Sequence, residues 1–276
     1  MKKVLVVVLV ICLLIGSIPA SASEMASGKE ALRNVDIEKK LEDAPINVLA
    51  VADAFEKMLS DDLIVIHKSK GNTGTISKIG GVATKNERII IDTINELLEI
   101  GALCIDFNGE LYTPNVKGNV INDVKKYYEK EVKQDVKVMS RSTAIETIDL
   151  LSMCDDNYSS LQTVYWVAFA AGLVVPGVAP WSTTVIYWVN KVREGGDWDY
   201  KRLEGFTPWD TEFYTYYDGY RHTVTSEYIG NFNYGYTGSY LFDLYTLYYG
   251  SYAVSGFDAA DVQDWPAITD GYNHAP

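Results

Sequence analysis

The part of this chain that most constrains its fold is the stretch 157–190, which contains no charged residue. Its centre, 164–181, is almost continuously apolar and is nearly as long as the ~20 residues that a helix needs to cross a bilayer. Proline and glycine interrupt this run within 176–180, and proline ends or kinks a helix because it lacks the backbone N–H donor. The sequence therefore predicts two buried helices joined by a Pro-Gly turn. The alternative is a segment that associates with a membrane through 164–189.

Residues 1–22 have the three parts of a secretory signal. Lys2 and Lys3 supply the positive start, 4–15 is apolar, and the small residues of 20–22 form a cleavage site. An uncleaved N-terminal anchor is the alternative interpretation. Both interpretations predict a secreted or cell-surface protein, and the second adds association with the membrane.

The chain is acidic, with a formal net charge of −13. From Asn190 to the end, five Lys and Arg residues stand against thirteen Asp and Glu residues. Nucleic-acid binding normally depends on cationic groups that neutralise phosphates, so we expect no stable DNA binding. An enzyme with a small local cationic site stays compatible with this charge.

Two cysteines follow the signal, Cys104 and Cys154, and they form either one disulfide or two buried thiols. The sequence has neither a CxxC pair nor the Cys/His spacing of a zinc site. The carboxylates Asp264 and Asp270 leave metal binding open. We nevertheless predict no metal site and no cofactor.

The element pattern predicts an α+β fold that is predominantly helical. A small N-terminal region of helices and a hairpin, over 23–138, precedes an α-rich, Tyr-rich C-terminal domain over 157–276. The dipeptide Asn108-Gly109 is a strong hairpin signal. In the first region we expect helices over 47–60, 85–100 and 120–138, a strand over 63–66, a loop over 69–81, and hairpin strands over 102–107 and 110–113.

Tyrosine is concentrated near the C-terminus, where fifteen of the twenty tyrosines lie between Tyr187 and Tyr272. They form two dense groups, within 214–220 and within 240–252. One interpretation is a core and surface built with an amphipathic side chain that tolerates half-burial. The other is a stacking platform for sugars, bases or peptides.

Two glycine-centred clusters, 191–201 and 230–238, stand out in the C-terminal half. Both are predicted to be loops, because glycine adopts backbone conformations that other residues avoid. In the first cluster, the Gly pair is predicted to end a helix that begins near Thr183. The second is either a turn-rich connection before a helix that begins near Tyr240, or a pocket opened by its glycines.

Residues 187–273 resemble the bacterial polymorphic toxin type 44 family. The resemblance rests on three segments, 192–201, 230–238 and 264–272, which occur in the order and approximate separation of the family. In many members a histidine stands where this chain has Asn233. The resemblance implies an effector domain that follows a delivery region, with RNA as substrate, a proposed ribonuclease activity and an immunity protein as partner.

The candidate catalytic residues are Lys201, Asp199 and His222. A lysine beside carboxylates in an aromatic wall could stabilise the anionic charge of a phosphorane. Asp199 would orient that lysine or act as a base, and His222 is a candidate because histidine side chains ordinarily titrate in the useful pH range. The candidate substrate-binding residues offer an aromatic face or neutral donors and acceptors: Trp198, Asn231, Asn233, Tyr234 and Thr237.

Two other classes of function fit the same sequence. Tyrosine density and acidity suit an extracellular protein that binds or hydrolyses glycans, since sugars stack on aromatic faces and paired carboxylates cleave glycosidic bonds. A surface protein without catalytic activity is the other alternative.

Overall fold

The computed structural model describes residues 44–69, 73–106, 108–114, 145–254 and 263–276. The predicted signal at 1–22 and the predicted helix over 120–138 lie outside these residues. In the described part of the chain far more residues lie in helices than in strands, so the predicted α+β, predominantly helical fold class is confirmed.

Internal packing divides the described residues into two units. Unit 1 takes those within 145–158 and 188–276, and unit 2 takes those within 44–114 and 159–187. The apolar stretch after Tyr158 thus packs with the N-terminal elements, although the sequence grouped it with the C-terminal domain.

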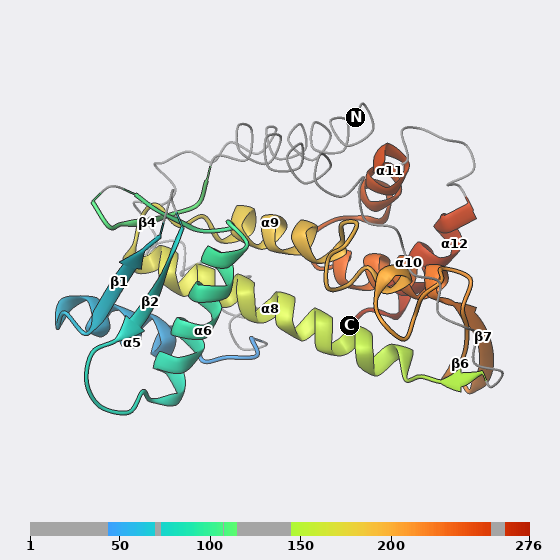
Figure 1. Cartoon of the computed structure of the whole chain (residues 1–276), viewed down its shortest axis with the longest axis horizontal. Helices are drawn as coiled ribbons and strands as arrows, with labels where there is room; N and C mark the ends of the chain where they lie inside the picture. The colour runs from blue at the N-terminus through green and yellow to red at the C-terminus, as the bar shows by residue number, and fades with distance from the viewer. Residues whose placement is uncertain (1–43, 70–72, 107, 115–144, 255–262) are drawn as a thin grey trace, which may run out of the picture. The chain divides into compact units, whose positions relative to one another are not determined.

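Unit 2 is built from two helices, two small hairpins and parts of two further helices. Figure 1 shows α5 and α6 beside the hairpin of β1 and β2. The elements are α5 (Val48–Ser60), β1 (Ile64–Lys68), β2 (Gly74–Lys78), α6 (Lys85–Glu99), β3 (Cys104–Ile105) and β4 (Leu111–Tyr112).

The helices predicted over 47–60 and 85–100 are confirmed as α5 and α6, and side-chain caps stabilise their first turns. Asn47 caps α5 by accepting a hydrogen bond from the backbone N–H of Ala50 at 3.0 Å. At α6, Thr84 and Glu87 form a capping box, which satisfies two N–H donors of the first turn reciprocally. Gly101 follows the end of α6 with φ +74°, a conformation that glycine adopts without steric cost.

The hairpin at Asn108-Gly109 is also confirmed, with β3 and β4 antiparallel and Ile105 opposite Leu111. The loop predicted over 69–81 is wrong, because β2 lies there and pairs with β1. The reason is one buried side chain, Ile76, whose backbone N–H and carbonyl are both bonded by the Asn95 amide of α6. The Asn95 contacts of Ile76 and the pairing with β1 together stabilise a strand in this Gly- and Thr-rich segment.

The two helices predicted in the apolar stretch are confirmed as α8 (Leu150–Val174) and α9 (Pro180–Val192). The Pro-Gly turn joins them, and the N–H of Thr113 donates to the carbonyl of Gly177 at 2.8 Å. None of the described helices combines the length and apolarity needed to cross a bilayer. Membrane association through 164–189 stays a prediction.

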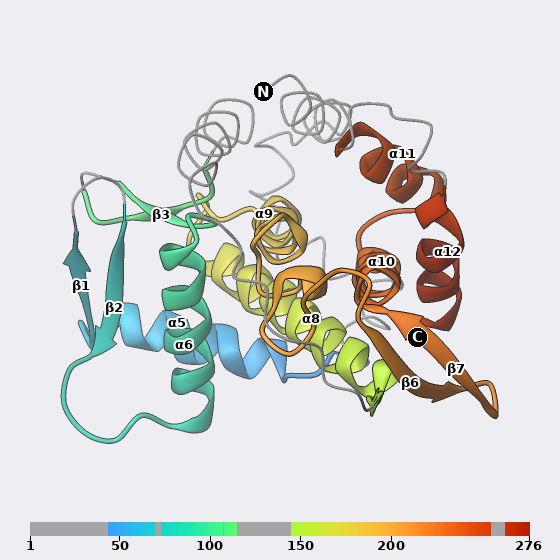
Figure 2. The same cartoon turned by 45° about the vertical axis from the view of Figure 1, so that its right-hand side comes forward.

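Unit 1 contains the start of α8, the last turn of α9, a small mixed sheet and three more helices. Strand β5 pairs parallel with β6, and β6 pairs antiparallel with β7. Figure 2 shows α10 beside α12, next to the β6–β7 hairpin. The further elements are β5 (Glu146–Thr147), η1 (Tyr200–Arg202), β6 (Glu212–Tyr217), β7 (Tyr220–Thr225), α10 (Ser226–Gly238), α11 (Leu244–Val254) and α12 (Trp265–His274).

The loop predicted over 230–238 is wrong, because this segment is the larger part of α10. Thr225 caps the helix by accepting from the N–H of Tyr228, and Ile229, Phe232 and Tyr236 bury one face of it. The helix expected from Tyr240 is α11, which begins at Leu244. Gly235 and Gly238 of α10 therefore serve close packing and do not open a loop.

Candidate functional site

The first glycine cluster is a compact turn after α9. Gly195 has φ +73°, and the N–H of Gly196 donates to the carbonyl of Arg193 at 2.9 Å. A Cβ on Gly196 would lie 2.8 Å from the carbonyl carbon of Lys191, so a larger residue does not fit there. The predicted role of the Gly pair at the helix end is confirmed.

Asp199 is buried beneath this turn. One carboxylate oxygen accepts from the N–H of Gly195 at 2.9 Å and from Nε of Arg202 at 3.1 Å. Burial raises the pKa of Asp199, while the Gly195 N–H and the charges of Lys201 and Arg202 oppose the rise. Asp199 and Lys201 are thus brought within electrostatic reach of each other, and Asp199 is occupied in holding the turn.

A chain of buried polar groups joins the first and second glycine clusters within unit 1. Nδ2 of Asn157 on α8 donates to Oη of Tyr200 at 2.8 Å and to Oδ1 of Asn233 at 2.9 Å. Asn233 is fully buried, and its own Nδ2 finds no partner in the described part of the chain. Burial raises the pKa of Tyr200 to about 12, although the bond from Asn157 opposes this rise.

The remaining predicted substrate-binding residues lie around the same chain of groups. Nε1 of Trp188 donates to Oγ1 of Thr237 at 3.0 Å, and that hydroxyl donates to the carbonyl of Asn233 at 2.7 Å. The ring of Tyr234 packs 4.9 Å from that of Trp188. Thr237 is fully buried and Trp198 nearly so, whereas Asn231 and Tyr234 are partly exposed. The predicted roles of these residues in binding stay predictions.

His222 lies in a different group of side chains, centred on Tyr217 of β6. Its ring stacks on the ring of Tyr217, with centroids 3.8 Å apart and an interplanar angle of 4°. The ring of His274, at the end of α12, meets the same tyrosine edge-on at 5.2 Å. The two imidazoles are therefore no farther apart than the sum of these two distances. We name this group the His222–His274 cluster; its members are Tyr217, Asp218, His222, Tyr228, Asp270 and His274.

The hydrogen bonds of the two imidazoles give them different protonation requirements. Nε2 of His222 donates to the carbonyl of Tyr217 at 3.2 Å, which leaves the lone pair of Nδ1 available when the ring is neutral. His274 faces an acceptor at each nitrogen, the carbonyl of Asp270 at 2.7 Å and the carboxylate of Asp218 at 3.1 Å. Both bonds form only when His274 is an imidazolium.

The pKa of His274 is correspondingly raised. Partial burial alone would lower it, but the bonds to the Asp270 carbonyl and the Asp218 carboxylate outweigh this effect. Its position in the last turn of α12 also favours a cation, because the helix dipole is negative there. The surroundings of His274 thus favour its protonated form, and His222 packs against the same tyrosine, Tyr217.

Two tyrosines complete the cluster. Oη of Tyr228 donates to Oδ2 of Asp270 at 2.6 Å and lies 3.0 Å from Oη of Tyr217. Burial and the bond to Asp270 raise the pKa of Tyr228, so it stays a neutral donor. These hydrogen bonds position the ring of Tyr217, against which both imidazoles pack.

The raised pKa of His274 predicts a pH dependence of stability. The protonated ring stabilises unit 1 below about pH 6.5, the ordinary pKa of histidine, and this contribution is lost as pH rises through the folded-state pKa. We expect His274→Gln to remove roughly 0.5–1 kcal/mol of unfolding free energy at about pH 5.5, and less at about pH 8. Urea unfolding at both pH values measures this. Equal losses at the two values would contradict it, and His67→Gln in unit 2 serves as the control.

The described residues contain no group of three or more His, Cys, Asp or Glu side chains that could hold a metal ion. Cys104 and Cys154 are buried thiols that form no disulfide with each other, and burial raises the pKa of Cys154. Comparisons with protein-family models, curated proteins and solved structures found no match for this chain.

Proposed function

We propose that the protein is an exported effector whose unit 1 cleaves RNA, with His222 and His274 of the His222–His274 cluster as the proton-transfer pair. The proposal rests on one observation: both imidazoles pack against the same tyrosine, Tyr217. The neutral ring of His222 can accept a proton at Nδ1, whereas His274 donates a hydrogen bond to Asp218. The secretory signal pattern and the resemblance to polymorphic toxin type 44 support it from the sequence.

The three segments of that resemblance pack together in unit 1, which also supports the proposal. Asn157 links Tyr200 of the first segment to Asn233 of the second. In the third segment, a Cβ on Gly271 would lie 2.7 Å from the carbonyl carbon of Phe232 in the second. Segments far apart in the sequence are therefore neighbours around α10, and Asp270 of the third segment belongs to the His222–His274 cluster.

The chemistry we propose is transfer within the RNA backbone. The 2′-oxygen bonds to phosphorus while the bond from phosphorus to the 5′-oxygen breaks. Nδ1 of His222 takes the 2′-hydroxyl proton, and His274 gives a proton to the departing 5′-oxygen. Asp218 is 64 % exposed, so its bond to Nε2 of His274 can be exchanged for one to substrate. We assign the proton transfers to the histidines because Asp199 is occupied by Gly195 and Arg202.

Exposed aromatic side chains of unit 1 suit the bases of such a substrate. Tyr220, at the tip of the β6–β7 hairpin, is 72 % exposed, and Trp209 is 58 % exposed. Stacking on such faces is tolerant of base identity, because every base has a π-face. The same side chains also fit sugar rings, which makes a glycan-binding or glycan-hydrolysing protein the second candidate.

Cleavage of labelled single-stranded RNA by the purified full chain tests the proposal. We expect His222→Gln to reduce the rate about 10²- to 10⁴-fold, because it removes the general base. His67→Gln replaces the one histidine of unit 2 and should leave the rate unchanged, as should a chelator. An inactive but folded wild-type chain, or equal activity in His222→Gln, would overturn the proposal. Titration with oligosaccharides, followed by tryptophan fluorescence, would then test the glycan candidate against a non-catalytic surface protein.

A further inference from the structure

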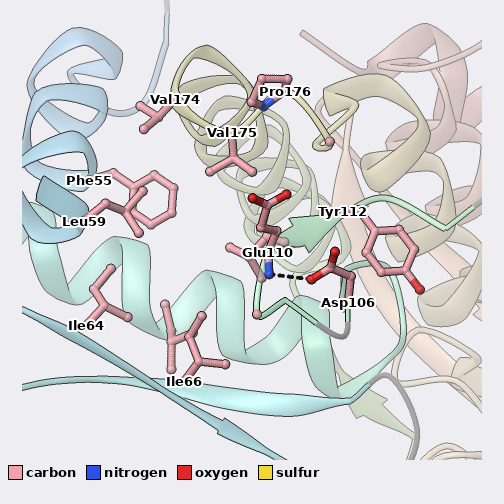
Figure 3. A pocket seen from close by; sticks show the side chains of 14 residues that line it. Phe55, Leu59, Ile64, Ile66, Asp106, Glu110, Tyr112, Val174, Val175 and Pro176 are labelled. Atoms are coloured by element: carbon pink, nitrogen blue, oxygen red, sulfur yellow. Dashed lines mark hydrogen bonds between the residues drawn. The ribbon is translucent and has the colours of Figure 1, made fainter. Parts of the chain in front are cut away.

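Unit 2 contains a cavity of about 670 Å³ that the proposed cleavage does not use. This volume lies in the range of small-molecule sites, which are usually 300–1,000 Å³. Figure 3 shows apolar side chains on three sides, from α5, from the β1–β2 hairpin and from the end of α8. The β3–β4 hairpin closes the fourth side and brings two carboxylates, Asp106 and Glu110.

The apolar side chains that line the cavity are more exposed to solvent than those of a hydrophobic core. Leu59 of α5 is 37 % exposed, and Ile64 and Ile66 of β1 are only half-buried although they face the hollow. Phe55, on the same helix as Leu59, is buried at the back of the lining. Covering this surface with an apolar chain would remove it from water, which is favourable in proportion to the area covered.

The two carboxylates have different roles. Asp106 accepts from the backbone N–H groups of Asn108 and Glu110, both at 2.8 Å, and so holds the hairpin turn. These bonds, from Glu110 first, lower the pKa of Asp106, partial burial opposes them, and the charge of Lys68 adds a smaller lowering. Asp106 is thus an ionised carboxylate whose acceptors are already engaged.

Glu110 differs, because its carboxylate makes no hydrogen bond or ion pair with the described part of the chain. Figure 3 shows this carboxylate beside Val175, across the hollow from Phe55 and Leu59. An anionic group at the edge of an apolar cavity favours a ligand whose cation lies next to a long apolar part. The neighbouring Asp106 adds to the negative potential there.

We propose that this cavity binds a single-chain amphiphile with a cationic head, its chain along Phe55, Leu59 and Ile66 and its head at Glu110. Calorimetric titration of the full chain with decyltrimethylammonium, below the concentration at which it forms micelles, tests this. We expect one saturable site with a negative heat-capacity change, since apolar surface is buried. Decyl sulfate, with the same chain and the opposite charge, should bind roughly tenfold more weakly or not at all.

Two pairs of variants test separately how the cationic head and the apolar chain of this ligand contribute to binding. Glu110→Gln should weaken decyltrimethylammonium binding roughly two- to fivefold, the range for an exposed ion pair, and leave decanol binding unchanged. Glu99→Gln, an exposed carboxylate of α6 outside the lining, is its control.

Leu59→Trp fills the cavity and should abolish binding of both probes, whereas Leu49→Trp, exposed on the same helix but outside the lining, should not. Thermal unfolding of each variant establishes that it is folded. Absence of saturable binding to the wild type, equal affinity for decyl sulfate, or unchanged binding in a folded Leu59→Trp would overturn the proposal.

Discussion

Replacing Gly235 with alanine should destabilise unit 1 by about 3 kcal/mol, at the upper end of the usual cost of overpacking. A Cβ there would lie 2.8 Å from the carbonyl carbon of Ile268 on α12, and closer still to its oxygen. The obstacle is backbone, so no side chain can rotate away, and α10 and α12 would have to separate. Gly271 makes the reciprocal approach from α12 to the carbonyl of Phe232. Urea unfolding followed by tryptophan fluorescence measures the loss.

Gly230 provides a matched control in the same helix. A Cβ on Gly230 would meet no atom within 4 Å. Gly230→Ala should therefore raise the unfolding free energy by up to about 1 kcal/mol, the difference in helix propensity between the two residues. If Gly235→Ala lay within about 0.5 kcal/mol of the wild type, the close approach of α10 and α12 would be disproved.

The elements that were predicted correctly from the sequence are specified by short-range features of the chain. Thr84 and Glu87 can form a capping box wherever the chain lies, and Asn108-Gly109 favours a tight turn before any tertiary contact forms. The Pro-Gly interruption of the apolar stretch is equally local, because proline removes a donor from any helix. These features needed no knowledge of distant neighbours.

The second glycine cluster shows where local reasoning fails. Glycine permits both unusual backbone conformations in loops and the close approach of packed elements. The sequence alone does not distinguish these two uses. At Gly235 the neighbour that requires glycine is the α12 backbone, and at Gly238 the neighbours are the ring of Trp188 and the side chain of Leu247. Packing against these neighbours makes a helix of a segment whose composition is typical of a loop.

The β6–β7 hairpin could have been predicted. Asp218-Gly219 is a two-residue turn signal like Asn108-Gly109, and both of its residues have positive φ, 53° and 78°. The buried residues Phe213, Thr215 and Tyr217 also alternate along β6, although the density of tyrosines obscured this period. The contact of His222 with Tyr217 follows from that hairpin. The contact of Asp218 with His274, across 56 residues, does not follow from any local pattern.

That long-range contact leads to a second large expected effect, on the RNA cleavage proposed above. Since His274 must carry a proton to act as the acid, activity falls as pH rises through its pKa. Asp218→Asn removes the carboxylate that raises this pKa, so the alkaline limb of the rate profile should move to lower pH. Asparagine tolerates the positive φ of position 218, so the turn should be retained. His274→Gln, which removes the acid altogether, should reduce the rate about 10²- to 10⁴-fold below the pKa of His274, and by less above it.

Two measurements distinguish a change in the pKa of His274 from a change in the catalytic step. NMR titration of the His274 ring reports its pKa whether or not RNA is cleaved, and the pH profile of kcat/KM reports the acid that catalysis uses. Both should shift downward together in Asp218→Asn and stay unchanged in Asp197→Asn, an exposed carboxylate that pairs with Lys191. A shift in the ring titration without a shift in the rate profile would mean that another group donates the proton. Because the Asp218 carboxylate also holds His274 in place beside Tyr217, a parallel shift would tie the hairpin turn directly to the chemistry.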